Sequence, residues 1–190
     1  ANTFGANAHK LDGAATVADV FAAAVTCARE AGARYVAGDI GPIGALLRPL
    51  GTLSFDEAYD LFAEEVRAGV DAGVDLFIIE TMTDLAEIKA AVLACRENSD
   101  LPVFATMTFE EDGRTFLGTS PEVAAITLDA IGADVLGINC SQGPAELRGL
   151  AARMLTVTDK PIMVQANAGL PHVDDDGNTV VEAEVPMAEM

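Results

Sequence analysis

Short apolar segments alternate with longer segments of helical periodicity along the whole chain. The periodicity predicts helices over residues 17–31, 55–72, 85–98, 121–131 and 144–158. The apolar runs predict strands over residues 35–37, 76–79, 102–107, 135–138 and 161–164, preceded by a truncated strand at residues 2–4. Such an alternation is typical of repeated β-α units that build a parallel sheet.

The ends of the predicted helices carry capping signals. Thr16 is placed as the N-cap of the first helix, and Ser54 with Glu57 three residues later forms a capping-box pattern. The junctions A-G-A-R-Y, A-G-V-D-L and I-G-A-D-V, which begin at residues 31, 72 and 131, nearly repeat each other. Their glycines can adopt the left-handed conformation that ends a helix. The repetition favours a barrel-like or doubly wound architecture made from one unit.

Two segments do not fit the β-α pattern. Thr106–Phe109 and Thr115–Leu117 flank the turn pair Asp112-Gly113, which predicts a small antiparallel ribbon. Residues 173–180 predict another ribbon, with three aspartates in its turn. These aspartates suggest a calcium loop, but the spacing around Gly177 lacks the acids that an EF-hand requires, so a solvated turn is the better interpretation.

Polar residues follow five of the predicted strands. The carboxyl ends of parallel strands meet at one edge of a sheet, where binding sites lie in barrels and in open sheets. We therefore expect these side chains to line one rim: Asp39, Glu80, Thr108, Asn139 with Cys140, and Asn167.

Each of these residues also has an alternative interpretation. Cys140 is either a packed small hydrophobic residue or a metal ligand or nucleophile. Asp39 is either a ligand contact or the residue that holds a glycine-rich turn, and Asn167 has the same two interpretations. Glu80 follows four apolar residues directly, so its carboxylate needs a cationic or hydrogen-bonding partner, which favours ligand contact.

Several common chemistries are excluded by the residues present. A Schiff-base enzyme needs a lysine in its pocket, but Lys89 lies within a predicted helix and Lys160 precedes its strand, which leaves Lys10 in a loop. Neither a Walker phosphate loop nor a dinucleotide fingerprint occurs. Neither His9 nor His172 ends a strand, so a histidine-rich metal site is not expected. Thiolate chemistry around Cys140 remains.

Composition sets outer limits on partners and location. The 190 residues are 51% hydrophobic, enough for one globular domain over residues 1–190. A net charge of −19 argues against nucleic acid and anionic membranes as partners. Three widely separated cysteines indicate a reducing cytoplasm, with Cys27 and Cys95 structural inside helices. The chain ends suggest a piece of a longer polypeptide.

Six motifs occur in order along nearly the whole chain. They are N-T-F-G-A-N at residues 2–7, G-D-I-G-P-I-G at 38–44, I-I-E-T-M at 78–82, M-T-F with G-R-T-F-L-G-T at 107–119, G-I-N-C-S-Q-G-P at 137–144 and N-A-G-L-P at 167–171. Together they resemble the homocysteine S-methyltransferase family, in particular the branch that forms the homocysteine-binding domain of cobalamin-dependent methionine synthase. The resemblance implies a (β/α)8 TIM-type barrel, here incomplete, with about six parallel strands that correspond to strands two to seven.

The resemblance also implies roles for the rim residues. Cys140 matches one of three cysteines that hold zinc in the family, and the other two, an adjacent pair, are expected outside this chain. Glu80 matches the acid that holds the amino group of homocysteine, and Asn167 matches an asparagine beside the zinc. Asp39 and Thr108 match further motif positions expected to contact substrate.

The expected function is therefore transfer of a methyl group to the zinc-activated thiol of homocysteine, giving methionine. Methylcobalamin is the expected donor, with cobalamin-binding and folate-binding domains of a longer polypeptide as partners; a sulfonium compound or betaine is the alternative donor. A second hypothesis is a non-catalytic fragment or assembly-dependent partial barrel whose open edges self-associate. A third is a metal-free barrel enzyme with Asp39 and Glu80 as an acid/base pair.

Overall fold

A curved sheet of five parallel strands forms the centre of the protein, in the order β1-β2-β3-β4-β5. The computed structural model describes residues 1–140, 142–167, 171–173 and 177–181. Its strands are β1 (Ala37–Ile40), β2 (Leu76–Met82), β3 (Val103–Met107), β4 (Val135–Asn139) and β5 (Ile162–Gln165), with a separate antiparallel pair β6 (Pro171–Val173) and β7 (Thr179–Val181). Its helices are α1 (Ala8–Leu11), α2 (Val17–Glu30), α3 (Phe55–Ala72), α4 (Leu85–Asn98), α5 (Pro121–Ala130) and α6 (Pro144–Met154).

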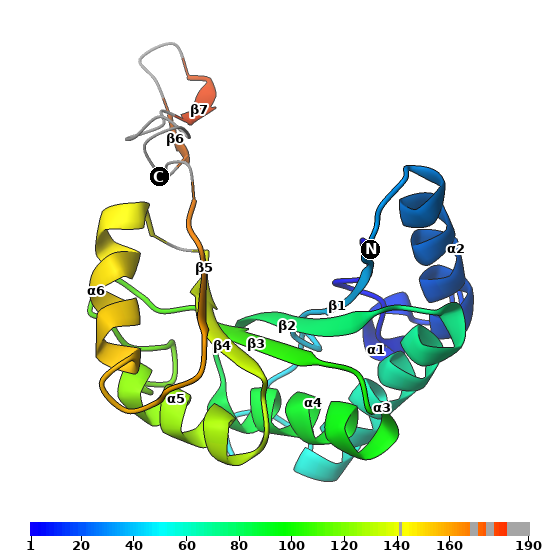
Figure 1. Ribbon diagram of the computed structural model, residues 1–190, viewed down its shortest axis with the longest axis horizontal. Coiled ribbons are helices and arrows are strands. Elements are labelled where there is room, and N and C mark those ends of the chain that lie inside the picture. Colours follow the sequence, from blue (N-terminus) through cyan, green and yellow to red (C-terminus); the bar gives the residue numbers. More distant parts are fainter. Residues whose placement is uncertain (141, 168–170, 174–176, 182–190) are drawn as a thin grey trace.

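The sheet bends into an open arc with α2 to α6 on its convex side (Figure 1). All four neighbouring pairs of strands are parallel. This arrangement confirms the expected α/β architecture, an incomplete barrel of the (β/α)8 type. None of the helices in the described part of the chain combines the length and apolar character of a membrane span.

The five long helices begin where the sequence predicts. The hydroxyl of Thr16 caps α2 and the capping box of Ser54 and Glu57 caps α3, because each supplies an acceptor to an otherwise unpaired N–H group. The apolar stripe of α3 is only partly buried, since Phe55 and Val70 at its two ends are exposed. A short helix, α1, lies where we expected a loop around Lys10.

The predicted strand at residues 2–4 is wrong. This segment lies beside the free edge of β1, but it is held by a side chain rather than by a regular ladder. The hydroxyl of Thr3 accepts from the backbone N–H of Asp39 and donates to its carbonyl, each over 2.8 Å. The carbonyl of Phe4 accepts from Gly41 at 3.2 Å. The sheet in the described residues therefore has five strands instead of the six expected.

Two of the three repeated helix-to-strand junctions share one set of contacts. In the second junction, Oδ2 of Asp75 accepts the backbone N–H of Val36 at 2.6 Å and pairs with Arg29 at 2.8 Å. In the third, Oδ2 of Asp134 accepts the N–H of Val103 at 2.8 Å and pairs with Arg96 at 3.0 Å. Each aspartate thus ties a strand to the start of its neighbour. These contacts confirm that the arc is built from a repeating unit.

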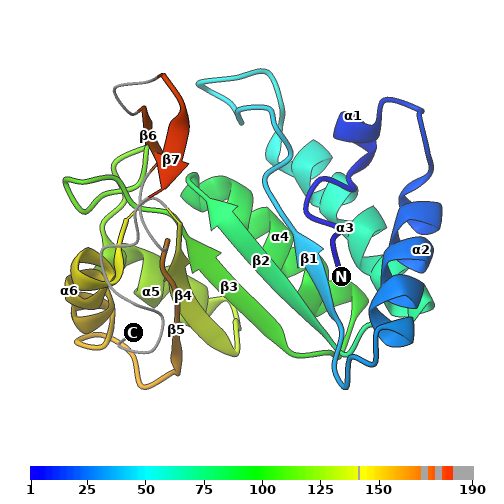
Figure 2. The same cartoon turned by 90° about the horizontal axis from the view of Figure 1, so that it is seen from above.

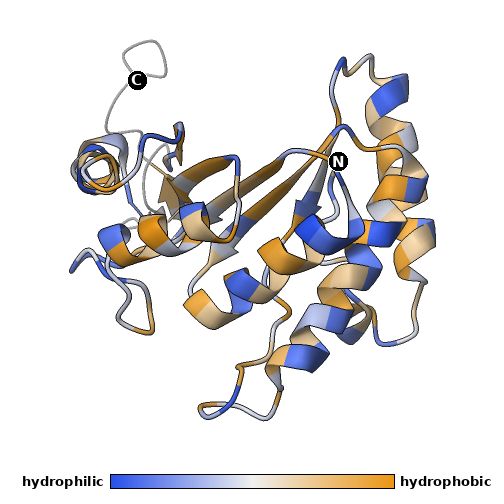
Figure 3. Cartoon of the chain, turned by 60° about the horizontal axis from the view of Figure 1, so that its bottom comes forward, coloured by the Kyte–Doolittle hydropathy of each residue, from blue (hydrophilic) through white to orange (hydrophobic). Residues whose placement is uncertain are grey.

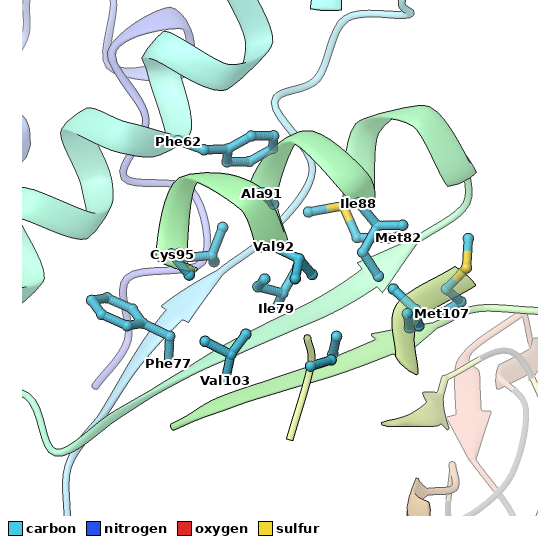
Figure 4. Packing of buried hydrophobic residues seen from close by; sticks show 14 of the residues in the cluster. Phe62, Phe77, Ile79, Met82, Ile88, Ala91, Val92, Cys95, Val103 and Met107 are labelled. Carbon is cyan, nitrogen blue, oxygen red and sulfur yellow. The ribbon is translucent and has the colours of Figure 1, made fainter. Parts of the chain in front are cut away.

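The hydrophobic core lies between the sheet and the helices (Figures 3 and 4). The outward-facing side chains of β2 and β3 meet α3 and α4 there, and residues such as Phe62, Phe77, Ile79 and Val103 are fully buried. Cys95 belongs to this core, as expected of a structural thiol. Cys27 differs from the expectation, because its side chain on α2 is exposed.

The two predicted ribbons have different outcomes. Residues 110–113 form a turn in which Gly113 donates to the carbonyl of Glu110 at 2.9 Å, but no strand ladder forms between residues 108 and 119. The second ribbon is confirmed by the pairing of β6 with β7. The aspartates at residues 174–176 lie outside the described residues.

Candidate functional site

The carboxyl ends of the five parallel strands lie along one edge of the arc (Figure 2). The structure places every expected site residue at this edge, one strand apart in the order of the sheet. Asp39 lies in β1, Glu80 in β2, Thr108 directly after β3, Cys140 directly after β4, and Asn167 two residues after β5. The described part of the rim is therefore assembled as the sequence predicts.

A bulge in β2 falls at Glu80 and Thr81. The register with β3 shifts between Ile79 and Met82, so the two intervening residues leave the regular ladder. Neighbouring residues of a regular strand point to opposite faces, and a bulge relaxes this alternation. Thr81 takes a left-handed conformation with φ 61°. A β-branched residue is strained there, at a cost of about 1–3 kcal/mol, so its surroundings must hold it.

The side chain of Asn139 is the centre of a hydrogen-bond network at this rim. Its Oδ1 accepts from the backbone N–H of Thr81 at 2.9 Å and from the hydroxyl of Thr106 at 2.8 Å. Its Nδ2 donates to the hydroxyl of Thr81 at 2.7 Å and to Sγ of Cys140 at 3.3 Å. Asn139 is 2% exposed, so these bonds connect β2, β3 and β4 in a largely dry environment.

Cys140 is half-buried at the mouth of the arc and is not part of the hydrophobic core. Its backbone also has a left-handed conformation, with φ 60°, and its N–H donates to the carbonyl of Gln165 at 3.0 Å. The hydroxyl of Thr81 lies 3.9 Å from Sγ. Cys140 is therefore only partly buried, and the side chains of Asn139 and Thr81 both contact its sulfur.

Thr108 and Gln142 join the loops around the thiol. The hydroxyl of Thr108, which is 7% exposed, donates to the carbonyl of Asn139 at 3.1 Å. Nε2 of Gln142 donates to the backbone carbonyls of Phe109 and Glu110 at 3.1 and 2.6 Å. The backbone carbonyl of Gln142 accepts from the N–H of Asn167 at 3.1 Å. Ser141, which the sequence places next to the thiol, lies outside the described residues.

Asp39 and Glu80 form the acidic part of the rim. Oδ1 of Asp39 is buried and has no hydrogen-bond partner among the described residues, so its carboxylate does not hold the glycine-rich turn through this atom. Burial first, and then the negative charge of Glu80, raise the pKa of Asp39 to about 7, while the amino terminus partly opposes them. Near neutral pH, Asp39 is thus a carboxyl group that is partly protonated, and it lies near a second carboxyl group, that of Glu80.

The described residues contain no group of three or more histidine, cysteine or acidic side chains that could hold a metal ion together. Cys140 itself suits zinc, which prefers thiolate ligands, and an N–H group directed at the sulfur is a common partner of a metal-bound ligand. The described residues therefore fit one ligand of a zinc site and supply the groups that orient it.

Sequence reasoning missed Thr81, Thr106 and Gln142. Thr81 and Gln142 lie within the motifs quoted for the resemblance, beside Glu80 and Cys140, so their position next to site residues was a usable signal. Thr106 lies inside an apolar strand and gave no signal of its own. Its role follows from the register of β3 with β4.

A family model described as homocysteine S-methyltransferase matches residues 1–189. The methionine synthase of Mycobacterium tuberculosis is 34% identical over 186 residues, and that of Mycobacterium leprae is 35% identical over 143 residues. The matched segments cover 90% and 73% of this chain but only 16% and 12% of those proteins.

Solved structures resemble the same arc. The homocysteine methyltransferase MmuM from Escherichia coli, in its metallated form, superposes with a TM-score of 0.74 at 21% identity. The superposition covers 86% of this chain and 64% of that protein. The carboxyl transferase domain of Rhizobium etli pyruvate carboxylase is more distant, with a TM-score of 0.52 at 16% identity over 77% of this chain and 25% of that one. At these identities the likeness concerns the fold.

Proposed function

Because the chain belongs to the homocysteine S-methyltransferase family, we propose that it forms part of a barrel that transfers a methyl group to the thiol of homocysteine, giving methionine. The observation that carries the proposal is the partly buried Cys140 at the carboxyl end of β4, with the amide of Asn139 directed at its sulfur. Residues 1–190 are proposed to be one partial barrel domain of a longer polypeptide.

Zinc is the proposed metal, and Cys140 is its proposed ligand in this chain. Two further cysteine ligands are proposed to come from outside residues 1–190. Zinc bound there would lower the pKa of the homocysteine thiol and keep the sulfur as a nucleophilic thiolate. The role of this chain is to orient the sulfur of Cys140 through the contacts of Asn139.

The remaining rim residues are proposed to bind and orient the substrate. Glu80 is proposed to hold the amino group of homocysteine, since a carboxylate at this rim offers charge-assisted hydrogen bonds to an ammonium group. Asp39 adds a second acceptor from β1. Thr108 fixes the backbone at Asn139, and Asn167, tied to Gln142, is proposed to lie beside the metal and substrate.

Methylcobalamin is the proposed methyl donor. Both mycobacterial relatives are methionine synthases, and this chain spans about a sixth of the length of the longer match, so most of each relative consists of other segments. We propose that cobalamin-binding and folate-binding domains of the longer polypeptide are the partners of this domain, and that the protein acts in the cytoplasm.

A Cys140→Ser variant of the longer polypeptide tests this function. The expected result is loss of most bound zinc, measured by elemental analysis, together with loss of homocysteine methylation. Cys27→Ser is the matched control, because this exposed thiol on α2 lies away from the rim and its replacement should change neither quantity. Unchanged zinc content and activity in Cys140→Ser would refute the proposal.

The open edge of the sheet supports a second candidate, an assembly-dependent partial barrel without its own activity. Within the described residues, β1 and β5 each have only one neighbour in the sheet. The segment at Thr3 and Phe4 covers part of the β1 edge, whereas Val164 in β5 is 43% exposed. Size-exclusion chromatography with zinc analysis of the 190-residue chain tests it: a monomer with stoichiometric, tightly bound zinc would contradict this candidate.

A further inference from the structure

Two strained residues meet at the rim. Thr81 and Cys140 both have left-handed backbone conformations, and the remaining non-glycine residue with positive φ in the described ranges, Asp12, lies at the end of α1. Strained backbone conformations persist only where other contacts hold them, and they cluster at functional sites. Here the N–H of Thr81 is bonded to Oδ1 of Asn139, and the N–H of Cys140 to the carbonyl of Gln165.

The contacts of Asn139 determine which way its amide points. A backbone N–H group can only donate, so the amide atom 2.9 Å from the nitrogen of Thr81 must be the oxygen. The hydroxyl of Thr81 then accepts from Nδ2 at 2.7 Å. One residue thus binds both ends of the amide, and a flipped amide would set two donors against each other.

The remaining hydrogen of Nδ2 consequently faces Sγ of Cys140 at 3.3 Å. The hydroxyl of Thr81 accepts from Nδ2, so its own hydrogen is available to the same sulfur, 3.9 Å away. Among the described residues, both donors to Sγ therefore depend on Thr81. The left-handed conformation of Thr81, with φ 61°, brings both its N–H group and its hydroxyl to the amide of Asn139.

We infer that Thr81 is a positioning residue for the thiolate at Cys140, and that it acts by locking the amide of Asn139 with its N–H group toward the sulfur. The inference rests on the proposed function, since it assigns Thr81 a role at the proposed metal ligand. Thr81 does not itself bind the metal. Donors directed at the sulfur stabilise the negative charge that a metal-bound thiolate retains.

Binding of an organomercurial cation measures this effect within the chain itself, because phenylmercury needs only one thiolate. In a Cys27→Ser background, Cys140 is the accessible thiol and Cys95 is fully buried. Competition with free cysteine at one fixed pH gives the relative affinity of Cys140 for phenylmercury. Neither zinc nor homocysteine is present, so a failure of the proposed function does not change this result.

The variants separate positioning from structural support. Thr81→Val removes the hydroxyl but keeps the backbone and the branched shape, and it should weaken phenylmercury binding about 10-fold. Thr81→Ser restores the hydroxyl and should recover most of that affinity. Asn139→Asp keeps an acceptor for the N–H of Thr81 but replaces the donor to Sγ by a negative oxygen, and it should bind more weakly than Thr81→Val.

Thr83→Val is the matched control, a threonine two residues farther along the chain without a contact to Asn139 or Cys140 among the described hydrogen bonds. Its affinity should equal that of the parent, and circular dichroism should confirm that every variant compared is folded. Folded Thr81→Val that binds phenylmercury as tightly as the parent overturns the inference. The inference is also overturned if Thr81→Ser binds phenylmercury as weakly as Thr81→Val, because the hydroxyl would then have no role.

Discussion

The carboxyl groups of Asp39 and Glu80 lie on neighbouring strands, close enough for the charge of Glu80 to raise the pKa of Asp39. Burial contributes the larger part, so replacing Glu80 removes only part of the shift. We expect Glu80→Gln to lower the pKa of Asp39 from about 7 to a value still above its ordinary 3.8. Carbon-detected NMR of the aspartate carboxyl groups measures this directly.

Glu146→Gln, which replaces an exposed acid on α6, is the control for the loss of one negative charge. It should leave the titration of Asp39 unchanged. Titration of Asp39 near pH 4 in the parent protein would contradict both the burial and the coupling. That result would also remove the support for the metal-free hypothesis in which Asp39 and Glu80 act as an acid/base pair.

The same shift has a consequence for stability. The folded protein binds the Asp39 proton more tightly than the unfolded chain, so Asp39 lowers the free energy of unfolding as pH rises from about 4 to about 7. Asp39→Asn cannot lose a proton. We therefore expect its stability relative to the parent to increase across this range and to level off above it, as measured by urea unfolding at several pH values.

Local signals in the sequence predicted most of the helices and strands, whereas contacts between strands determine the conformation of several site residues. Ser54 and Glu57 are three residues apart, so the cap they form is visible in the sequence and is confirmed. Glu80 was found because an acid after an apolar run needs a partner. Thr81 was missed because its conformation depends on a register shift between β2 and β3, which no local pattern encodes.

The incorrect strand at residues 2–4 has a similar cause. The segment has the composition of a strand, but the hydroxyl of Thr3 forms the bonds to Asp39 that a backbone ladder would have formed. The sequence predicts where the site residues lie better than it predicts what each of them does. Their place at the rim follows from parallel strands, whereas the function assigned to each remains a proposal.

Gly137 in β4 tests how closely the strands pack beneath Cys140. A Cβ at this position would lie 2.1 Å from the carbonyl oxygen of Met163 in β5. Gly137→Ala should therefore destabilise the protein by about 2–3 kcal/mol, because backbone atoms must move apart. At Gly149 in α6 such a Cβ meets nothing within 4 Å apart from the neighbouring backbone of its own helix, and Gly149→Ala should stabilise by about 0.5–1 kcal/mol.

Urea unfolding of the two alanine variants gives both free energies. Both substitutions add one methyl group, so the test is whether they change the free energy of unfolding in opposite directions. Equal effects from Gly137→Ala and Gly149→Ala would show that the contact between β4 and β5 is looser than the structure indicates.

Asp75 connects stability to acid pH. The backbone N–H of Val36, which donates to Asp75, is the largest cause of the lowered pKa of Asp75; burial opposes it, and the side chain of Arg29 adds to the lowering. The contribution of Asp75 to stability is present above the unfolded value of about 3.8 and is lost as pH falls through the folded pKa. Asp75→Asn should thus lower the melting temperature at pH 6 and have a smaller effect near pH 2.

The matched control is Asp71→Asn, an exposed acid in the last turn of α3. It should change the melting temperature little at either pH. If Asp75→Asn and Asp71→Asn behave alike, the contact at the repeated junction does not stabilise the arc.

Glu65 on α3 gives the last prediction. It is 0% exposed, and neither carboxylate oxygen has a hydrogen-bond partner among the described residues. Burial, in the first place, raises its pKa well above the usual value, and the charge of Lys10 only partly opposes this. An unpaired buried carboxyl group is costly, so Glu65→Met, which fills similar volume, should stabilise the protein by about 1–3 kcal/mol.

The sign of the pH dependence distinguishes this cause from better packing alone. Because the folded pKa of Glu65 is raised, the parent loses stability as pH rises above the unfolded value of 4.5. The advantage of Glu65→Met should therefore grow between pH 5 and pH 8 in urea unfolding, whereas Glu64→Met, its exposed neighbour on α3, should show no such growth. A pH-independent advantage would mean that Glu65 has a partner that satisfies its charge.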